Sequence, residues 1–141
     1  MKIEPYLFFD GRAEEAIEFY KKAVGAQVTA LMRFKDNPDS AGCQPAPGSE
    51  NKIMHANVQI GESVVMVSDG QCQGKMKFDG FSLSLSAANP DEANKLFKAI
   101  SEGGQVMMPM AKTFFSPAFG MAQDRFGVTW MVIVPVPMPQ A

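Results

Sequence analysis

Apolar and polar residues alternate along this chain with two periods, and the period changes at glycines and prolines. Apolar residues at helical spacing form one stripe in each of two segments, about 12–24 and about 90–102. A period of two, typical of half-buried strands, is clear at 53–60 and 81–86. The segments predicted as strands are about 3–9, 26–35, 53–60, 63–68, 81–87, 105–110, 118–123 and 128–134. The pattern therefore predicts an α+β fold.

The ends of both predicted helices are marked by residues that suit those positions. Gly25 follows the first helix, where a left-handed backbone conformation is favoured. Before the second helix, Asn89 can cap free N–H groups and Pro90 fits the first helical position. Glu92 stands three residues after the cap, as in a capping box. The helix boundaries are therefore predicted from end signals as well as from periodicity.

The same order of elements occurs twice. Residues 15–28 read EAIEFYKKAVGAQV and residues 92–106 read EANKLFKAISEGGQV, offset by 77 residues at the start and 78 at the end. An internal period of this size indicates a duplicated module. Each half reads strand–helix–strand–strand–strand. The sequence therefore predicts one domain at 1–137, built from two βαβββ modules in tandem at about 1–70 and 78–137, with a tail at 138–141.

The main difference between the halves is a loop at 36–52, which reads DNPDSAGCQPAPGSENK. Its three prolines and two glycines leave no periodicity that would bury a face. Because this loop is the one asymmetric insertion, it is a candidate for a lid or a partner contact. A plain surface loop is the alternative.

The composition of the chain excludes some classes of protein and some classes of partner. Apolar residues make up 46% of the chain, charged residues 20%, and the net charge is −2. This balance favours neither nucleic acid nor an anionic membrane as partner. No apolar run approaches the roughly 18–20 residues that span a bilayer, and the short, acidic N-terminus is not a secretion signal. We expect a cytoplasmic protein in which Cys43 and Cys72, at no metal-binding spacing, are free thiols.

Two predicted strands carry a polar face opposite an apolar one. The polar residues are His55, Asn57 and Gln59 on the first strand and Ser82, Ser84 and Ser86 on the second. His55 is the only histidine in the chain, which makes it the best candidate for general acid–base work. A structural histidine that is hydrogen-bonded beside Asn57 is the alternative. The serine row either lines a binding cup or faces water.

Residues near the C-terminus have competing interpretations. Phe114 and Phe115 precede the last hairpin and could cap a cavity or close the core. The segment Asp124–Gly127 is interpreted as a hairpin turn, with the aspartate bonding nearby backbone and the glycine at positive φ. If Met131 faces a cup, its neighbour Trp130 faces the helix and is core.

Three stretches resemble the PhnB-like branch of the vicinal-oxygen-chelate superfamily, which includes glyoxalases, bleomycin-resistance proteins and extradiol dioxygenases. They are PYLFFDGRAEEAIEFYKKAVGA at 5–26, KIMHANVQIGESVVMVSD at 52–69 and QDRFGVTWMVIV at 123–134. With the second helix, the resemblance covers nearly the whole chain. It implies two cupped mixed sheets around a shared cavity, each with a helix on its other face, and a homodimer.

The resemblance also says where a metal would be held. Metal-dependent relatives place ligands on the first and last strand of each module. An ungapped alignment on the helices puts these positions at Pro5 and Ser82, and the closing strands put them at Met66 and Met131. Proline has no ligand atom, serine is a poor ligand, and a thioether suits Cu(I). We therefore expect no metal site of that type.

The branch that this chain resembles sometimes carries a ubiquinone-methyltransferase label. No glycine-rich turn between a strand and a helix is present to hold a nucleoside cofactor, so we expect no cofactor. The favoured function is metal-independent binding of a small molecule in the cup between the modules. A lyase or isomerase that uses His55 and a non-catalytic interaction module are the alternatives. The candidate ligand-binding residues are His55, Asn57, Met66, Ser82, Ser84, Phe114, Phe115 and Met131.

Overall fold

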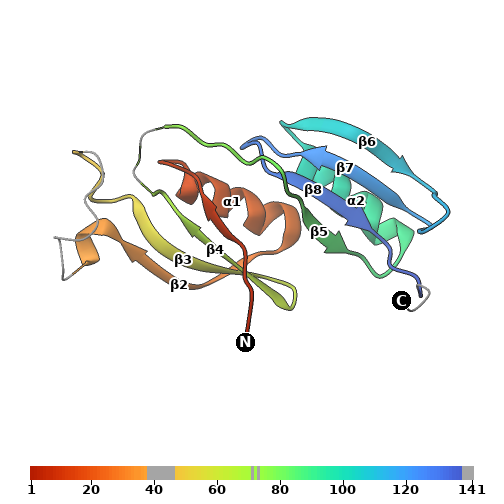
Figure 1. The fold of residues 1–141 in the computed structure, drawn as a ribbon, viewed down its shortest axis with the longest axis horizontal. Helices are drawn as coiled ribbons and strands as arrows, with labels where there is room; N and C mark the ends of the chain where they lie inside the picture. Colours follow the sequence, from red (N-terminus) through yellow and green to blue (C-terminus); the bar gives the residue numbers. More distant parts are fainter. Residues whose placement is uncertain (38–46, 71, 73, 138–141) are drawn as a thin grey trace. The chain divides into compact units, whose positions relative to one another are not determined.

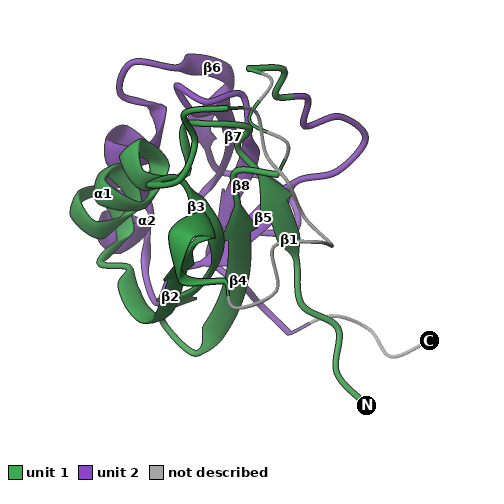
Figure 2. Ribbon diagram, turned by 90° about the vertical axis from the view of Figure 1, so that its left-hand side faces the viewer, with its two compact units in different colours: residues 1–76 green, residues 77–141 purple. Residues whose placement is uncertain are grey.

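A computed structural model describes residues 1–37, 47–70, 72 and 74–137 (Figure 1). The chain divides into two compact units, Met1–Met76 and Lys77–Ala141, which Figure 2 colours separately. Each unit holds one four-stranded sheet and one long helix. The predicted repetition of one module is therefore confirmed at the level of topology.

Unit 1, which is Met1–Met76, has the strand order β1-β4-β3-β2. The outer strand β1 runs parallel to β4, and the other neighbours are antiparallel. The elements are β1 (Tyr6–Phe8), α1 (Ala13–Val24), β2 (Gln27–Arg33), the 3-10 turn η1 (Phe34–Asp36), β3 (Ile53–Ile60) and β4 (Ser63–Ser68).

Unit 2, which is Lys77–Ala141, repeats this topology with the order β5-β8-β7-β6. Here β5 runs parallel to β8, and the other neighbours are again antiparallel. The elements are β5 (Leu83–Ser86), α2 (Pro90–Ser101), β6 (Gln105–Ala111), β7 (Phe119–Gln123) and β8 (Thr129–Ile133). Both units are thus mixed α+β modules, as predicted.

The predicted boundaries hold best for the helices and for the hairpin of β3 and β4. The first strand of each unit is shorter than the pattern suggested, with three residues in β1 and four in β5. Most of the 36–52 loop, at 38–46, lies outside the described residues together with Cys43 and the 138–141 tail. The lid interpretation of that loop therefore stays a prediction.

Helix α1 packs on one face of the unit 1 sheet through its apolar stripe. The buried residues of the helix are Ala13, Ala16, Ile17 and Tyr20, and those of the strands include Leu7, Ala56, Val58 and Val67. The helix ends at Gly25, whose φ of 68° and N–H bond to the Tyr20 carbonyl form the predicted left-handed cap. The alternating pattern of β3 therefore places its apolar face toward the helix.

Helix α2 packs in the same way on the unit 2 sheet. Its buried residues are Ala93, Phe97 and Ile100, facing Ala122, Trp130 and Val132 of the strands. Gly120 of β7 allows this approach, because a Cβ there would lie 2.9 Å from Phe97 Cε2. Trp130 is 2% exposed, which confirms its interpretation as a core residue.

The segment Asp124–Gly127 is a hairpin turn, as predicted. The Asp124 carboxylate accepts hydrogen bonds from the N–H groups of Phe126 and Val128 and from the Trp130 indole. Gly127 has a φ of 96°, a region that favours glycine. This carboxylate is 3% exposed and serves the turn.

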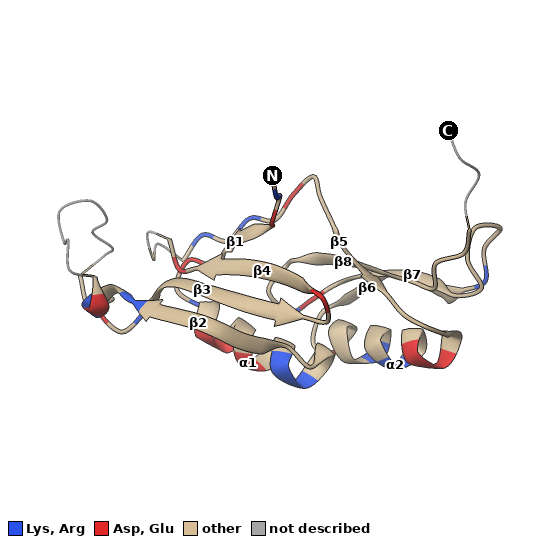
Figure 3. Cartoon of the chain, turned by 90° about the horizontal axis from the view of Figure 1, so that it is seen from below, with Lys and Arg blue, Asp and Glu red and all other residues tan. Residues whose placement is uncertain are grey.

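Charged side chains lie mainly on the helices and loops, and the strands carry few (Figure 3). In both helices acidic residues occupy the first turn and basic residues the last, which suits the helix dipole. None of the helices in the described residues is long and apolar enough to cross a membrane.

Candidate functional site

One face of the unit 1 sheet packs against α1, and the opposite face carries polar and aromatic side chains. Cross-strand partners point to the same side of a sheet, so the register identifies this face. Met66 of β4 pairs with Tyr6 of β1 and with Asn57 of β3, and His55 of β3 pairs with Met32 of β2. We call the set Tyr6, Phe8, Met32, His55, Asn57 and Met66 the open face of unit 1.

A chain of hydrogen bonds crosses this open face. The Tyr6 hydroxyl lies 2.8 Å from His55 Nδ1, and His55 Nε2 lies 2.8 Å from Asn57 Oδ1. Because a carboxamide oxygen only accepts, Nε2 carries the proton of this second bond. In the tautomer with its proton at Nε2, Nδ1 accepts the Tyr6 O–H. The histidine therefore links two side chains that are 51 residues apart, Tyr6 and Asn57.

The aromatic rings of β1 flank this chain of hydrogen bonds. Tyr6 and Phe8 stack with ring centroids 5.1 Å apart, and Tyr6 lies 5.5 Å from the His55 ring. Phe8 also packs close to Gly70, where a Cβ would come within 3.2 Å of Phe8 Cδ1. Both rings stay accessible, since Tyr6 is 38% and Phe8 55% exposed. Large aromatic rings on an exposed sheet face offer apolar area for a ligand.

The register corrects the alignment that assigned Pro5 to the first-strand position. Met66 pairs with Tyr6, and its counterpart Met131 pairs with Ser84, so the matching residues are Tyr6 and Ser84. They are 78 residues apart, whereas the helix starts, at 13 and 90, are 77 apart.

The difference arises because four residues, 9–12, connect β1 to α1, and three, 87–89, connect β5 to α2. A shift of one residue moves a side chain to the other face of a strand. Pro5 therefore matches Leu83, on the helix side, and Ser82 lies just before β5. Sequence analysis missed Tyr6 because an ungapped alignment on the helices cannot account for the one-residue difference between the two strand–helix connections.

The corresponding face of unit 2 has different chemistry. In the same register, Ser84 stands at the position of Tyr6, Phe119 at that of His55, and Met121 at that of Asn57. Met131 matches Met66. The predicted serine row is thus on the face with Met131, but no hydrogen-bonded chain like that of unit 1 can form from these side chains.

The two adjacent phenylalanines are held differently by the loop before β7. Phe115 packs edge-on against Phe119 with centroids 5.0 Å apart, whereas Phe114 is 100% exposed. The loop is anchored by buried Ser116, whose hydroxyl lies 2.8 Å from the carbonyl oxygens of Ala118 and Val134. Phe115 therefore closes one end of the unit 2 face, and Phe114 projects from it.

A metal site finds no support in the side chains of the described residues. No group of three or more His, Cys, Asp or Glu side chains there is arranged to hold a metal ion. The register-corrected positions are Tyr6, Met66, Ser84 and Met131, a set without a carboxylate or an imidazole. Hard divalent ions prefer oxygen or nitrogen ligands from carboxylates and histidines. The residues therefore do not fit the metal centre of metal-dependent relatives.

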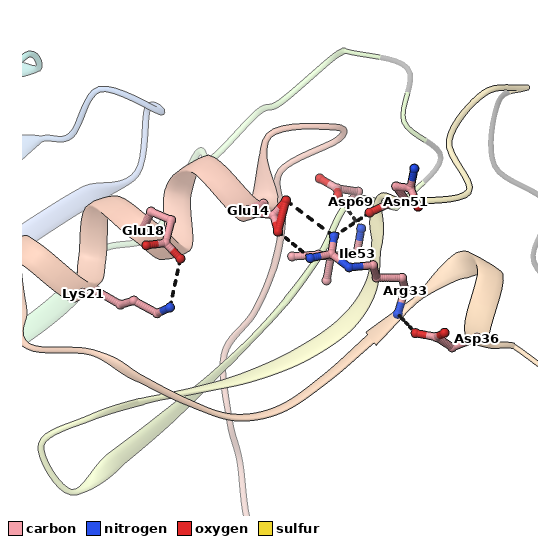
Figure 4. A network of polar contacts seen from close by, with 8 residues as sticks. All are labelled: Glu14, Glu18, Lys21, Arg33, Asp36, Asn51, Ile53 and Asp69. Carbon is pink, nitrogen blue, oxygen red and sulfur yellow. Dashed lines mark hydrogen bonds and ion pairs between the residues drawn. The ribbon is translucent and has the colours of Figure 1, made fainter.

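A second polar cluster in unit 1 connects the end of β2 to α1 and to the segment before β3 (Figure 4). Arg33 at the end of β2 donates to the Glu14 carboxylate of α1 at 2.5 Å and to the Asn51 carbonyl at 2.6 Å. The hydrogen bond from Arg33 holds the pKa of Glu14 below its ordinary value of 4.5. Nearby, burial raises the pKa of the Cys72 thiol, which disfavours the thiolate.

Comparison with known proteins finds a matching family and structures with the same fold. A family model described as 3-demethylubiquinone-9 3-methyltransferase matches residues 1–133. Protein YjdN of Escherichia coli is 34% identical over 140 residues, covering 95% of each chain. The crystal structure of PA1353 from Pseudomonas aeruginosa has a TM-score of 0.82 at 39% identity, over 96% of this chain and 98% of that one.

The chain belongs to this family. A putative 3-demethylubiquinone-9 3-methyltransferase, PhnB protein, from Bacillus cereus is also similar, with a TM-score of 0.77, 26% identity and coverage of 95% and 99%. A glyoxalase-related enzyme from Fulvimarina pelagi shares the fold at a TM-score of 0.63 and 15% identity, over 100% and 96%. The PhnB-like resemblance inferred from the sequence is confirmed, and the expected glyoxalase-like fold is confirmed as well.

The family description implies a methyl donor, which is commonly a nucleoside cofactor held at a glycine-rich strand–helix turn. In unit 1 the corresponding N–H groups, at Gly11 and Ala13, already donate to Asp69 Oδ1 at 2.8 Å each. In unit 2 Asn89 accepts from the Glu92 N–H. At both helix starts the protein's own side chains thus accept from backbone N–H groups, an arrangement that does not fit such a cofactor.

Proposed function

We propose that this PhnB-like protein binds a small organic molecule on the open face of unit 1 without a metal ion. The observation that carries the proposal is the Tyr6–His55–Asn57 chain of hydrogen bonds on an exposed face beside two exposed aromatic rings. Polar side chains arranged among apolar ones are typical of small-molecule sites, where the polar groups set orientation.

The packing of unit 1 supports a role in binding more than one in folding. The core lies on the helix side of the sheet, where Ala56, Val58 and Val67 are at most 1% exposed. The hydrogen-bonded chain lies on the other side. Unit 2 builds the same topology with Phe119 and Met121 at the matching positions, so the fold itself does not require a histidine and an asparagine there.

Thermal-shift screening of a metabolite library in the presence of EDTA tests the proposal. A ligand should raise the melting temperature of the wild-type protein, since saturation at 100 times Kd adds about 2.7 kcal/mol to the free energy of unfolding. His55→Ala should fold normally and lose most of this ligand-induced shift. Ser84→Ala changes the position that matches Tyr6 in unit 2 and should keep the shift.

Three outcomes would count against metal-independent binding on this face. One is a ligand-induced shift that EDTA abolishes, and another is a shift that His55→Ala leaves intact. The third is the absence of any shift across the library. The homodimer stays a prediction, and light scattering on the purified protein would check it.

A further inference from the structure

We infer that the ligand carries a carbonyl or carboxylate oxygen attached to a planar group, and that Asn57 and the β1 aromatic rings contact it while His55 positions them. This inference rests on the proposed function and names the class of ligand for the same site. It assigns to His55 a role other than that of a general base.

Both ring nitrogens of His55 are already engaged within the protein. Nδ1 lies 2.8 Å from the Tyr6 hydroxyl and Nε2 lies 2.8 Å from Asn57 Oδ1. A general base needs a free nitrogen within hydrogen-bond reach of the proton it removes. The ring instead fixes the orientation of a side chain on either side of it.

At Asn57, the hydrogen-bonded chain ends in a group that can donate further hydrogen bonds. With its oxygen turned to His55, the Asn57 carboxamide directs its N–H2 group away from the ring, and this group has no protein acceptor within the described ranges. The residue is half-buried, and no described side-chain nitrogen that lacks a partner is fully buried, so this N–H2 group is accessible to solvent. A pair of amide donors recognises an oxygen acceptor, and a carbonyl or carboxylate supplies one.

The aromatic end of the open face sets the shape of the ligand. Asn57 and Tyr6 both pair with Met66, so they are separated by two strand spacings, which is about 10 Å between backbones. Tyr6 and Phe8 stack on each other at an interplanar angle of 23°, which turns one face of each ring toward the other, and the exposed remainder of the pair is an aromatic surface on which a further ring can pack. A planar group that packs on these rings with its oxygen at Asn57 fits this spacing.

Simple probes test this class directly by NMR. Benzamide has the ring and the neutral oxygen, benzoate has the ring and a charged one, cyclohexanecarboxamide lacks the planar ring, and toluene lacks the oxygen. Titration of the ¹⁵N-labelled protein should show saturable shifts of the Asn57 side-chain amide signals with benzamide and benzoate. Cyclohexanecarboxamide should bind more weakly, and toluene should leave those amide signals in place.

Two variants, one of them with a matched control, separate contact from positioning. Asn57→Met, which installs the side chain found at the matching Met121, should raise the Kd of benzamide roughly two- to tenfold, as expected for one lost hydrogen bond. Gln59→Met, on the same face of β3, should leave Kd unchanged. His55→Phe should broaden or split the Asn57 amide signals, because the Nε2 donor that holds the carboxamide in place is gone.

The ¹⁵N chemical shifts of the His55 ring test the positioning role directly, because they report which ring nitrogen carries the proton. The imidazole ring should show a protonated Nε2 and an acceptor Nδ1, and Tyr6→Phe should move the Nδ1 signal. The opposite tautomer, or an unchanged Kd in Asn57→Met, would overturn the inference. If a library compound binds the open face while benzamide and benzoate do not, the inference fails and the proposed function stands. If nothing binds the open face, both fail.

Discussion

Matching positions of the two units carry different side chains on the face away from the helix. In unit 1 they are Tyr6, His55 and Asn57, joined by hydrogen bonds, and in unit 2 they are Ser84, Phe119 and Met121. On the helix side, both units present buried apolar residues to the helix. The comparison teaches that the topology constrains the face under the helix, while the other face is free to take on different chemistry.

The helix starts of the two units also differ in how their N–H groups are satisfied. Helix α1 has no side-chain cap from Arg12, and the carboxylate of Asp69, at the end of β4, replaces it. Asp69 is 1% exposed and also accepts the Ile53 N–H at 2.8 Å. Helix α2 is capped locally by Asn89. Unit 1 therefore depends on a contact between distant segments where unit 2 uses a neighbour.

The largest effect on stability is expected from Asp69→Ala. Three N–H groups would lose a charged acceptor, and we expect the free energy of unfolding to fall by about 3–5 kcal/mol. Asp124→Ala also removes three hydrogen bonds, but all lie within one hairpin, so a loss of about 2 kcal/mol is expected.

Urea unfolding followed by circular dichroism and by the fluorescence of Trp130, the single tryptophan, measures both variants. Hydrogen exchange of the β3 amides reports on unit 1. Equal losses for the two aspartates would contradict the distinction between a carboxylate that joins distant segments and one that serves a turn.

A smaller effect is expected from Asn89→Ala. The side chain accepts from the Glu92 N–H at 2.8 Å, and removal of such a cap costs about 1 kcal/mol. Asn89→Asp, which keeps an acceptor and suits the helix dipole, should restore the stability. The melting temperatures of the two variants, measured side by side, provide the check. An effect as large as that of Asp69→Ala would show that the local cap is no weaker than the remote one.

The smallest effect concerns the link between Arg33 and Glu14, for which Glu14→Gln is the test. Both side chains are partly exposed, so the loss at neutral pH should be about 0.5 kcal/mol or less. Because the pKa of Glu14 is lowered in the folded state, its contribution is present above pH 4.5 and disappears as pH falls through the lowered pKa.

The stability difference between wild type and Glu14→Gln should therefore vanish in acid. Urea midpoints between pH 3 and pH 7, an interval chosen around the ordinary carboxyl pKa, measure it. Glu18→Gln, which breaks the pair with Lys21 three residues along α1, is the control on the same helix. A Glu14 difference that stays constant over this range would contradict the assigned cause of the pKa shift.

Sequence periodicity and end signals determined much of this protein in advance. Both helices, the caps at Gly25 and Asn89, the β3–β4 hairpin and the turn at Asp124 follow from local patterns. Such features are readable because they arise from the spacing of side chains along a single element and from backbone preferences of glycine, proline and asparagine. The polar face of β3 was readable for the same reason.

Only the tertiary structure decided which residues meet on that face. Tyr6 reaches His55 across 49 positions of the chain, and Asp69 reaches the start of α1 across 56. Because the connection from β1 to α1 is one residue longer than that from β5 to α2, the first-strand position that faces the site belongs to Tyr6 and not to Pro5. Side chains alternate with a period of two in strands, so the face a residue occupies depends on strand pairing, which local sequence does not encode.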